Sequence, residues 1–415
     1  MKKSPVLRIP RALAAAACAA ALLAACGGGK DPASLRAKRA QAARGDIVIG
    51  AAWPWEARSG ILYRQGMDMA VEEINAAGGV LGRPLKILRE DDHESVNDGR
   101  LVAQRFADNP DVVAVIGHLQ SYVTIPAAPI YDLSGLVLLA PAATDPGLTG
   151  AHLPRVFRGT FTDGQAGRQL ADFAAARGYR SVAIYYVRNS YGRSLANAFE
   201  ERAGERGVRI AARQSYDPNA APSAQGLEPI LTEWKGLEFD AILLAGETPH
   251  AAVFLAEARS HGIGVPVLGG DALGVPDLLA AGRAAEGTVI VAAFHPDAPA
   301  PEVRRFADAF RRRFGAAPDA GAALGYDAVR VLADAIRRAG SAAPDRVAEA
   351  LHATRGWQGV TGPFTYDGAG DLPDKPIFTV TVRNGRFEYL DAPAMAAASP
   401  LPDTARTPGG TGDGA

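Results

Sequence analysis

The sequence predicts an α/β protein built on two doubly wound parallel sheets. Short apolar runs, such as 112–116 and 136–139, are typical of buried parallel strands. Segments with helical periodicity lie between such runs, and parallel strands need crossover connections of this kind. The strands are too numerous for one sheet of usual width, so we expect two sheets.

The first part of the folded sequence alternates between strands and helices. Strands are expected at 47–52, 84–90 and 112–116, with helices around 67–74 and at 98–108. In the first helix, one face carries the apolar residues at i, i+3, i+4 and i+7, which are Met67, Ala70, Val71 and Ile74. This helix should end at 75–79, where a glycine suits a left-handed C-terminal turn.

The alternation continues to residue 268 and then changes. Further strands are expected at 181–186, 208–216, 241–245 and 265–268, with helices at 194–206, 226–235 and 249–261. Breaks are predicted at 158–163, where the alternation restarts, and at 295–301, where prolines stiffen a linker. Beyond the second break, we expect helices at 302–314, 320–339 and 344–353, a third change at 362–371 and a disordered tail.

The N-terminal residues form a targeting segment. A positive region is followed by the apolar run 13–21 and by Leu23-Ala24-Ala25-Cys26, which is the layout of a signal peptide at 1–25. The ending resembles a bacterial lipobox, which implies acylation of Cys26; the alternative is an ordinary cleaved signal with an incidental cysteine. Residues 26–45 are expected to be a polar tether, with folded sequence starting near Asp46.

Charge and cysteine content exclude several classes of protein. The chain has 44 Lys+Arg and 45 Asp+Glu, and removal of the basic signal segment leaves a slightly acidic protein without the basic patch that nucleic acid requires. The two cysteines, Cys18 and Cys26, both lie in the targeting segment or at its end, so no disulfide is expected in the mature domain. No later apolar run reaches membrane-spanning length.

Small polar residues follow two successive predicted strands. Gly117 to Thr124 comes after the strand at 112–116, and Ala140 to Pro146 comes after the strand at 136–139. Ligands of open α/β sheets bind at the carboxyl ends of strands. Ser121 stands where a helix should begin, and a helix N-terminus favours an anion such as a carboxylate. Ser121 as a helix cap, and Thr144 as a turn residue, are the structural alternatives.

No motif indicates catalysis, a metal or a cofactor. The run Asp91-Asp92-His93-Glu94 alternates its side chains between two faces, so one ion would rarely gather all four. The histidines lack HExxH spacing, and the glycines at 78–82 follow a helix without GxGxxG order. We therefore expect neither an enzyme nor a metal or cofactor site.

Several landmarks in order resemble the branched-chain amino-acid (Leu/Ile/Val) type of periplasmic substrate-binding protein of ABC importers. They are Gly66, the run 70–85, Asp91-Asp92, Val115-Ile116-Gly117-His118, Pro141-Ala142-Ala143-Thr144 and Tyr191-Gly192. The resemblance implies the type I periplasmic binding protein fold, with two Rossmann-like lobes joined by three crossovers. Lobe 1 is then expected at 46–160 plus 296–364, lobe 2 at 161–295 plus 365–394, and the tail at 395–415.

The resemblance also implies how an amino acid would bind. Ser121 and Thr144 would hold its carboxylate, and the Ala142 carbonyl would accept from its ammonium. Asp271, where the family often has Glu, would pair with the ammonium, and Tyr191 would cover the ligand from the second lobe. Gln120 and Glu94 stand where some relatives have a disulfide.

Two departures from the family pattern bear on the ligand. Glu247 stands where the leucine-type binder has an aromatic ring, and a buried carboxylate needs a cation, a proton or hydrogen-bond donors. The loop 53–60 carries Trp53 and Trp55 in place of a Ser/Gly-rich run, so these residues, with Tyr122, are candidates for a ligand wall. Both departures argue against a purely aliphatic ligand.

The resemblance implies a periplasmic, lipid-anchored, monomeric receptor. It would deliver an amino acid or a related small molecule to an ABC permease by lobe closure, without nucleic acid. The alternatives are a sensor or envelope interaction lipoprotein on the same fold, because fold alone does not fix function, and a binder of an amide or aromatic acid.

Overall fold

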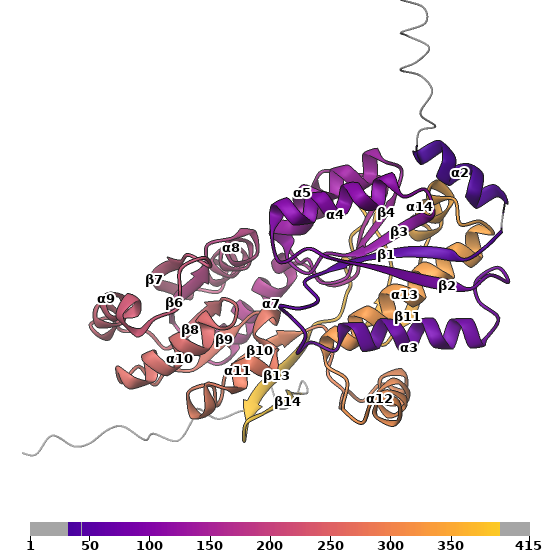
Figure 1. The fold of residues 1–415 in the computed structure, drawn as a ribbon. Helices are drawn as coiled ribbons and strands as arrows, with labels where there is room; N and C mark the ends of the chain where they lie inside the picture. The colour runs from indigo at the N-terminus through magenta and orange to yellow at the C-terminus, as the bar shows by residue number, and fades with distance from the viewer. Residues whose placement is uncertain (1–31, 43, 391–415) are drawn as a thin grey trace, which may run out of the picture.

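The computed structural model describes residues 32–42 and 44–390, which form two α/β lobes side by side (Figure 1). The predicted signal peptide 1–25, Cys26 and the predicted tail 395–415 lie outside these described residues. In the described part of the chain, no helix combines the length and the apolar character needed to cross a membrane.

The first lobe is built on a five-stranded sheet in the order β2-β1-β3-β4-β5, and every pair in it is parallel. Its strands are β1 (Ile47–Trp53), β2 (Leu85–Asp91), β3 (Val112–Gly117), β4 (Val137–Ala140) and β5 (Val156–Arg158). Its helices in this part of the chain are α3 (Tyr63–Ala76), α4 (Val96–Asp108), α5 (Ser121–Leu133) and α6 (Gly147–Gly150).

The second lobe is built on a seven-stranded sheet in the order β14-β13-β10-β9-β8-β6-β7. Its parallel strands are β6 (Ser181–Val187), β7 (Arg209–Tyr216), β8 (Ala241–Ala245), β9 (Val267–Gly269) and β10 (Val289–Ala292). The hairpin of β13 (Phe378–Arg383) and β14 (Arg386–Leu390) adds an antiparallel edge, which the sequence patterns did not predict. The predicted fold class is confirmed, with this mixed edge as an addition.

Helices cover the second sheet and separate its strands along the chain. They are α7 (Asp163–Ala176), α8 (Ser190–Glu205), α9 (Ala224–Lys235), α10 (His250–Ser260) and α11 (Pro276–Leu279), with short 3₁₀ turns η1 (Asp271–Leu273) and η2 (Gly282–Ala284). The helices predicted at 194–206, 226–235 and 249–261 are present with small shifts of their ends.

The chain returns to the first lobe after β10. The returning elements are α12 (Pro301–Phe314), α13 (Ala320–Ala339), α14 (Pro344–His352) and the hairpin β11 (Trp357–Gly359) with β12 (Gly362–Phe364). Helix α13 crosses α3 so closely that a Cβ at Gly66 would lie 1.9 Å from the Ala322 carbonyl oxygen. Glycine is required at this crossing.

The chain passes between the lobes for a third time when it leaves the first lobe for β13. This passage lies later than the predicted boundary at residue 364. Tyr366 and Leu372 pack in the hydrophobic core around the first sheet, whereas Val380 packs in the core of the second. The chain therefore leaves the first lobe after Leu372. The remaining lobe boundaries stay predictions.

Part of the predicted tether is a helix packed on the first lobe. In α2 (Pro32–Ala42), the buried Arg36 donates hydrogen bonds to the carbonyls of Ala107, Asn109, Val112 and Ser134. These carbonyls lie around the ends of α4 and α5 and the start of β3. The expected start of folded sequence near residue 46 is therefore too late, because Arg36 ties an apparently polar segment to the lobe.

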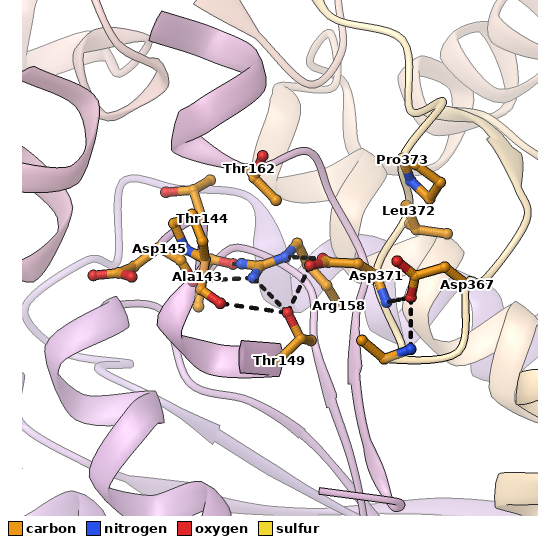
Figure 2. A network of polar contacts seen from close by, with 12 residues as sticks. Ala143, Thr144, Asp145, Thr149, Arg158, Thr162, Asp367, Asp371, Leu372 and Pro373 are labelled. Carbon is orange, nitrogen blue, oxygen red and sulfur yellow. Dashed lines mark hydrogen bonds and ion pairs between the residues drawn. The ribbon is translucent and has the colours of Figure 1, made fainter. Parts of the chain in front are cut away.

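A buried guanidinium at the end of β5 ties three loops together (Figure 2). Arg158 is fully buried and donates through Nε to Asp371 Oδ1 at 2.5 Å. Its other nitrogens donate to the carbonyls of Ala143 and of Asp145, the latter at 3.0 Å. Thr149 completes the network by donating to Asp371 Oδ2 at 2.6 Å. One cation thus fixes the loop after β4 to the third passage between the lobes.

The first passage of the chain between the lobes, from β5 to α7, joins the same network. Helix α7 starts at Asp163, whose N–H donates to the Thr144 carbonyl at 2.8 Å. Two residues further, the Gln165 amide donates to the carbonyls of Leu372 and Pro373 at 3.3 and 2.7 Å. The loop after β4 is therefore held from both passages.

Replacing Arg158 tests how much this network stabilises the fold. Arg158→Met removes a donor from the Asp371 carboxylate and from the carbonyls of Ala143 and Asp145, while Thr149 still donates to Asp371. Breaking a buried ion pair from one side costs about 3–5 kcal/mol, and we expect a fall of that size in the free energy of unfolding.

Urea denaturation measures the change, with Arg346→Met as the control. Arg346 and its partner Glu349 are both exposed on α14, so the loss of this pair should cost no more than about 1 kcal/mol. Equal costs for the two variants would contradict a special role for Arg158.

Candidate functional site

A cavity of about 360 Å³ lies between the two lobes. The first lobe contributes loops that follow strands β1, β3 and β4, and the second contributes loops that follow β6, β8 and β9. Its lining includes these residues predicted from the sequence: Trp53, Ser121, Ala142, Thr144, Tyr191, Glu247 and Asp271. The carboxyl ends of parallel strands from both lobes thus converge on one site, as expected for open α/β sheets.

Ser121 stands at the first position of α5, with Gln120 as the N-cap residue. Its Oγ accepts hydrogen bonds from the backbone N–H groups of Thr144 and Asp145, each at 3.2 Å. With its oxygen engaged as acceptor, the hydroxyl remains free to donate its proton. The N-terminus of α5 carries a partial positive charge from its helix dipole. This side of the cavity therefore favours an anion.

Two carboxyl groups lie close to each other at the cavity, and of these Asp271 lines it. Asp163 is fully buried, and neither of its carboxylate oxygens has a well-formed hydrogen bond to the part of the chain that the structure describes. Burial, followed by the charge of Asp271, raises the pKa of Asp163 well above its usual range, while the nearby Thr144 hydroxyl and the Arg158 guanidinium oppose this rise. The pattern of residues gave no signal for Asp163, which begins α7 as an ordinary capping-region acid.

Asp271 lies next to this acid, at the start of η1. Within the described residues, its Oδ1 has no hydrogen-bond partner. Burial raises the pKa of Asp271 to about 6, although the Tyr191 hydroxyl and nearby N–H groups stabilise the carboxylate. A cationic group bound in the cavity beside Asp271 would stabilise the Asp271 carboxylate.

Tyr191 connects α8 to this acidic side. Asn189 caps the helix by accepting from the Gly192 N–H at 2.9 Å, and the buried Tyr191 hydroxyl accepts from the Ala272 N–H at 3.4 Å. Burial is the main cause that raises the pKa of the phenol. A Cβ at Gly270 would lie 2.2 Å from the phenol oxygen, so glycine allows the ring to reach this position.

Of the aromatic residues predicted as a ligand wall, only Trp53 lines the cavity. Its ring stacks on Tyr63 with centroids 3.7 Å apart. Trp55 lies outside the lining, because its Nε1 donates to the Glu90 carbonyl at 3.0 Å and arginines cover its face. Tyr122 is also outside, with its hydroxyl donating to the Glu94 carbonyl at 3.2 Å. Trp55 and Tyr122 thus lie outside the cavity lining in this structure, and their role as a ligand wall stays a prediction.

Glu247 faces the cavity together with a residue that the sequence patterns did not single out. The Glu247 Oε1 accepts from Asn189 Nδ2 at 2.9 Å, and its Oε2 lies 3.8 Å from Nη2 of Arg58. Arg58 belongs to the loop 53–60, whose unusual composition was noted from the sequence. It is the only cation of that loop, and this was the signal available for finding it.

The side chains of the acidic run 91–94 hold neighbouring loops in place and do not converge on one point. Asp91 accepts from the N–H groups of Glu56 and His93, whereas Asp92 accepts from the Glu94 N–H and lies 2.6 Å from the His118 ring. Among residues 32–42 and 44–390, no three His, Cys, Asp or Glu side chains form a cluster suited to a metal ion.

Comparison with known proteins gives the family. A family profile described as a periplasmic binding protein matches residues 46–386. The Leu/Ile/Val-binding protein homolog 1 of Brucella suis is 29% identical over 363 residues, which are 83% of this chain and 93% of that protein. An amino acid binding protein of Pseudomonas aeruginosa is 29% identical over 222 residues, and this chain covers 58% of its length.

A solved structure of another protein also resembles the fold of this chain. The ABC transporter substrate-binding protein from Desulfitobacterium hafniense, in complex with Leu, matches with a TM-score of 0.75 and 38% identity, over 83% of this chain and 100% of that chain. The resemblance noted from the sequence is thereby confirmed. The chain belongs to the periplasmic binding protein family, as a substrate-binding protein of the ABC-transporter type and not an enzyme.

Proposed function

We propose that this protein captures an α-amino acid between its lobes and delivers it to an ABC permease. The observation that carries the proposal is the presence of an anion-favouring helix N-terminus and of an unsatisfied acid in one cavity. Ser121, at that N-terminus, and Thr144 line the cavity together with Asp271, whose Oδ1 has no hydrogen-bond partner among the described residues. An α-amino acid carries one carboxylate and one ammonium on the same carbon, and so matches both sides.

The residues around the head group then have the following roles in binding. Ser121 and Thr144 donate to the ligand carboxylate, and the Ala142 carbonyl accepts from the ammonium. Asp271 and Asp163 pair with the ammonium, and Tyr191 covers the head group from the second lobe. The ligand named with the Desulfitobacterium hafniense protein, Leu, supports this class of ligand. Closure of the lobes over the ligand would exclude water and strengthen these contacts.

We also propose that the protein is a monomeric lipoprotein of the periplasm, held to the membrane through Cys26. The support is the signal layout followed by Leu23-Ala24-Ala25-Cys26. The docking of α2 on the first lobe leaves only a short segment after Cys26 to connect that lobe with an anchor.

Removing the head-group hydroxyls tests the anion side. The double variant Ser121→Ala and Thr144→Ala loses two donors to the carboxylate, so its Kd for an α-amino acid should rise at least tenfold, or about 1.4 kcal/mol. Isothermal titration calorimetry measures this, with Ser134→Ala at the far end of α5 as the control. Unchanged affinity in the double variant would remove the carboxylate role.

The pH dependence of affinity tests the acidic side. Because the pKa of Asp271 is raised to about 6, the free protein takes up a proton as the pH falls through that value and gains stability from it. An ammonium pairs only with the carboxylate, so affinity should fall about tenfold between pH 7 and pH 5.

Titrations at the two pH values check this dependence. Asp271→Asn should flatten it and weaken binding at pH 7, whereas Asp277→Asn, at a nearby exposed acid, should leave it unchanged. An affinity for α-amino acids that is equal at pH 5 and pH 7 would contradict pairing with Asp271.

Cell fractionation tests the anchor. Cys26→Ser removes the acylated thiol, so the protein should move from the membrane fraction to the soluble periplasm. Cys18→Ser, within the signal peptide, should not change its location. Retention of the Cys26→Ser protein in membranes would show that another contact holds it there.

A further inference from the structure

Arg58 and Glu247 face each other across the cleft from different lobes. Arg58 lies in the loop after β1, and Glu247 lies in the loop after β8. Their nearest charged atoms, Nη2 and Oε2, are 3.8 Å apart, which is too long for a direct hydrogen bond. The pair thus forms an open ion pair at the cavity surface.

Other contacts hold both side chains in place. Arg58 donates through Nε to Glu94 Oε1 at 2.5 Å, and Glu94 also accepts from the Gln120 amide at 3.2 Å. The Glu247 Oε1 accepts from Asn189 at 2.9 Å, and its backbone N–H donates to the Tyr216 hydroxyl at 2.9 Å. The two side chains are therefore positioned before any ligand arrives.

Hydrogen-bonding groups of both side chains remain unused. Within the described chain, neither terminal nitrogen of Arg58 donates a hydrogen bond and Glu247 Oε2 accepts none. The Arg58 side chain is 17% exposed and the Glu247 side chain 13% exposed. Lobe closure over a ligand would remove the remaining water, and a buried donor or acceptor left unpaired costs about 1–3 kcal/mol.

Three classes of ligand side chain fit this pair poorly. An aliphatic side chain would leave the terminal nitrogens of Arg58 and Oε2 of Glu247 without a hydrogen bond. A carboxylate would pair with Arg58 but would meet the charges of Glu247 and Glu94. An ammonium or guanidinium would pair with Glu247 but would meet Arg58. Each class leaves at least one charged group unsatisfied in the closed cleft.

We propose that the ligand is an α-amino acid whose side chain ends in a primary carboxamide. The carboxamide oxygen accepts from a terminal N–H of Arg58, and its NH₂ group donates to Glu247 Oε2. Bond lengths place the oxygen and nitrogen of an amide about 2.3 Å apart. Two roughly parallel hydrogen bonds can therefore reach the two atoms that lie 3.8 Å apart. This inference rests on the proposed head-group site and adds the ligand's side chain.

Calorimetry with a panel of amino acids tests the inference. Glutamine and asparagine supply the carboxamide, norleucine an aliphatic chain, glutamate a carboxylate and ornithine an ammonium. We expect glutamine or asparagine to bind at least tenfold more tightly than each of the other three. Norleucine binding as tightly as the better carboxamide would overturn the carboxamide inference and leave the proposed function standing. Failure of every α-amino acid to bind would overturn both.

A charge-neutral variant tests which residues make the selection. Glu247→Gln keeps an acceptor oxygen but removes the charge that repels a carboxylate. The ratio of glutamate to glutamine affinity should therefore rise at least tenfold, while Glu233→Gln, at an exposed position of α9, leaves it unchanged. Thermal denaturation of the variant confirms that it folds. An unchanged ratio in folded Glu247→Gln protein would overturn the role of the Arg58–Glu247 pair.

Discussion

The buried guanidinium of Arg158 is the contact on which the arrangement of the site depends. It binds the loop after β4 through the carbonyls of Ala143 and Asp145, and it binds Asp371 in the third passage between the lobes (Figure 2). That loop carries Thr144, and the Thr144 carbonyl in turn receives the N–H of Asp163 from the first passage. A change of angle between the lobes would therefore act on the same backbone that lines the cavity. This gives a physical route from lobe movement to affinity.

The second constraint is electrostatic. Asp271 and the N-terminus of α5 both border the cavity, Asp163 is buried near Asp271, and burial raises the pKa of both acids. In the proposed complex, the ligand ammonium stabilises the Asp271 carboxylate. At Arg58 and Glu247, hydrogen-bond donors and an acceptor likewise lack a partner within hydrogen-bond distance. In this account, both parts of the cavity select the ligand through the free-energy cost of leaving polar groups unpaired. This cost discriminates between ligands more strongly than apolar contact does.

Periodicity and turn residues predicted most of the architecture, because local patterns determine it. The helix at 320–339 was predicted to the residue, and the parallel strands followed from apolar runs. Helix α2 was missed because Arg36 looks like one polar residue among many, and only the carbonyls of distant segments make it structural. The β13–β14 hairpin was missed although Asn384-Gly385 is a strong turn signal. Asp163 and Arg58 were missed because their roles arise only where separate loops meet.

The central claim is that a zwitterionic head group bridges the two charged sides of the cleft. A crystal structure of the protein with its tightest-binding amino acid tests this most directly. The account predicts the ammonium within hydrogen-bond distance of Asp271 and Asp163, and the carboxylate on Ser121 and Thr144. A ligand bound with its carboxylate toward the acids, or with no charged group between Asp163 and Asp271, would contradict it.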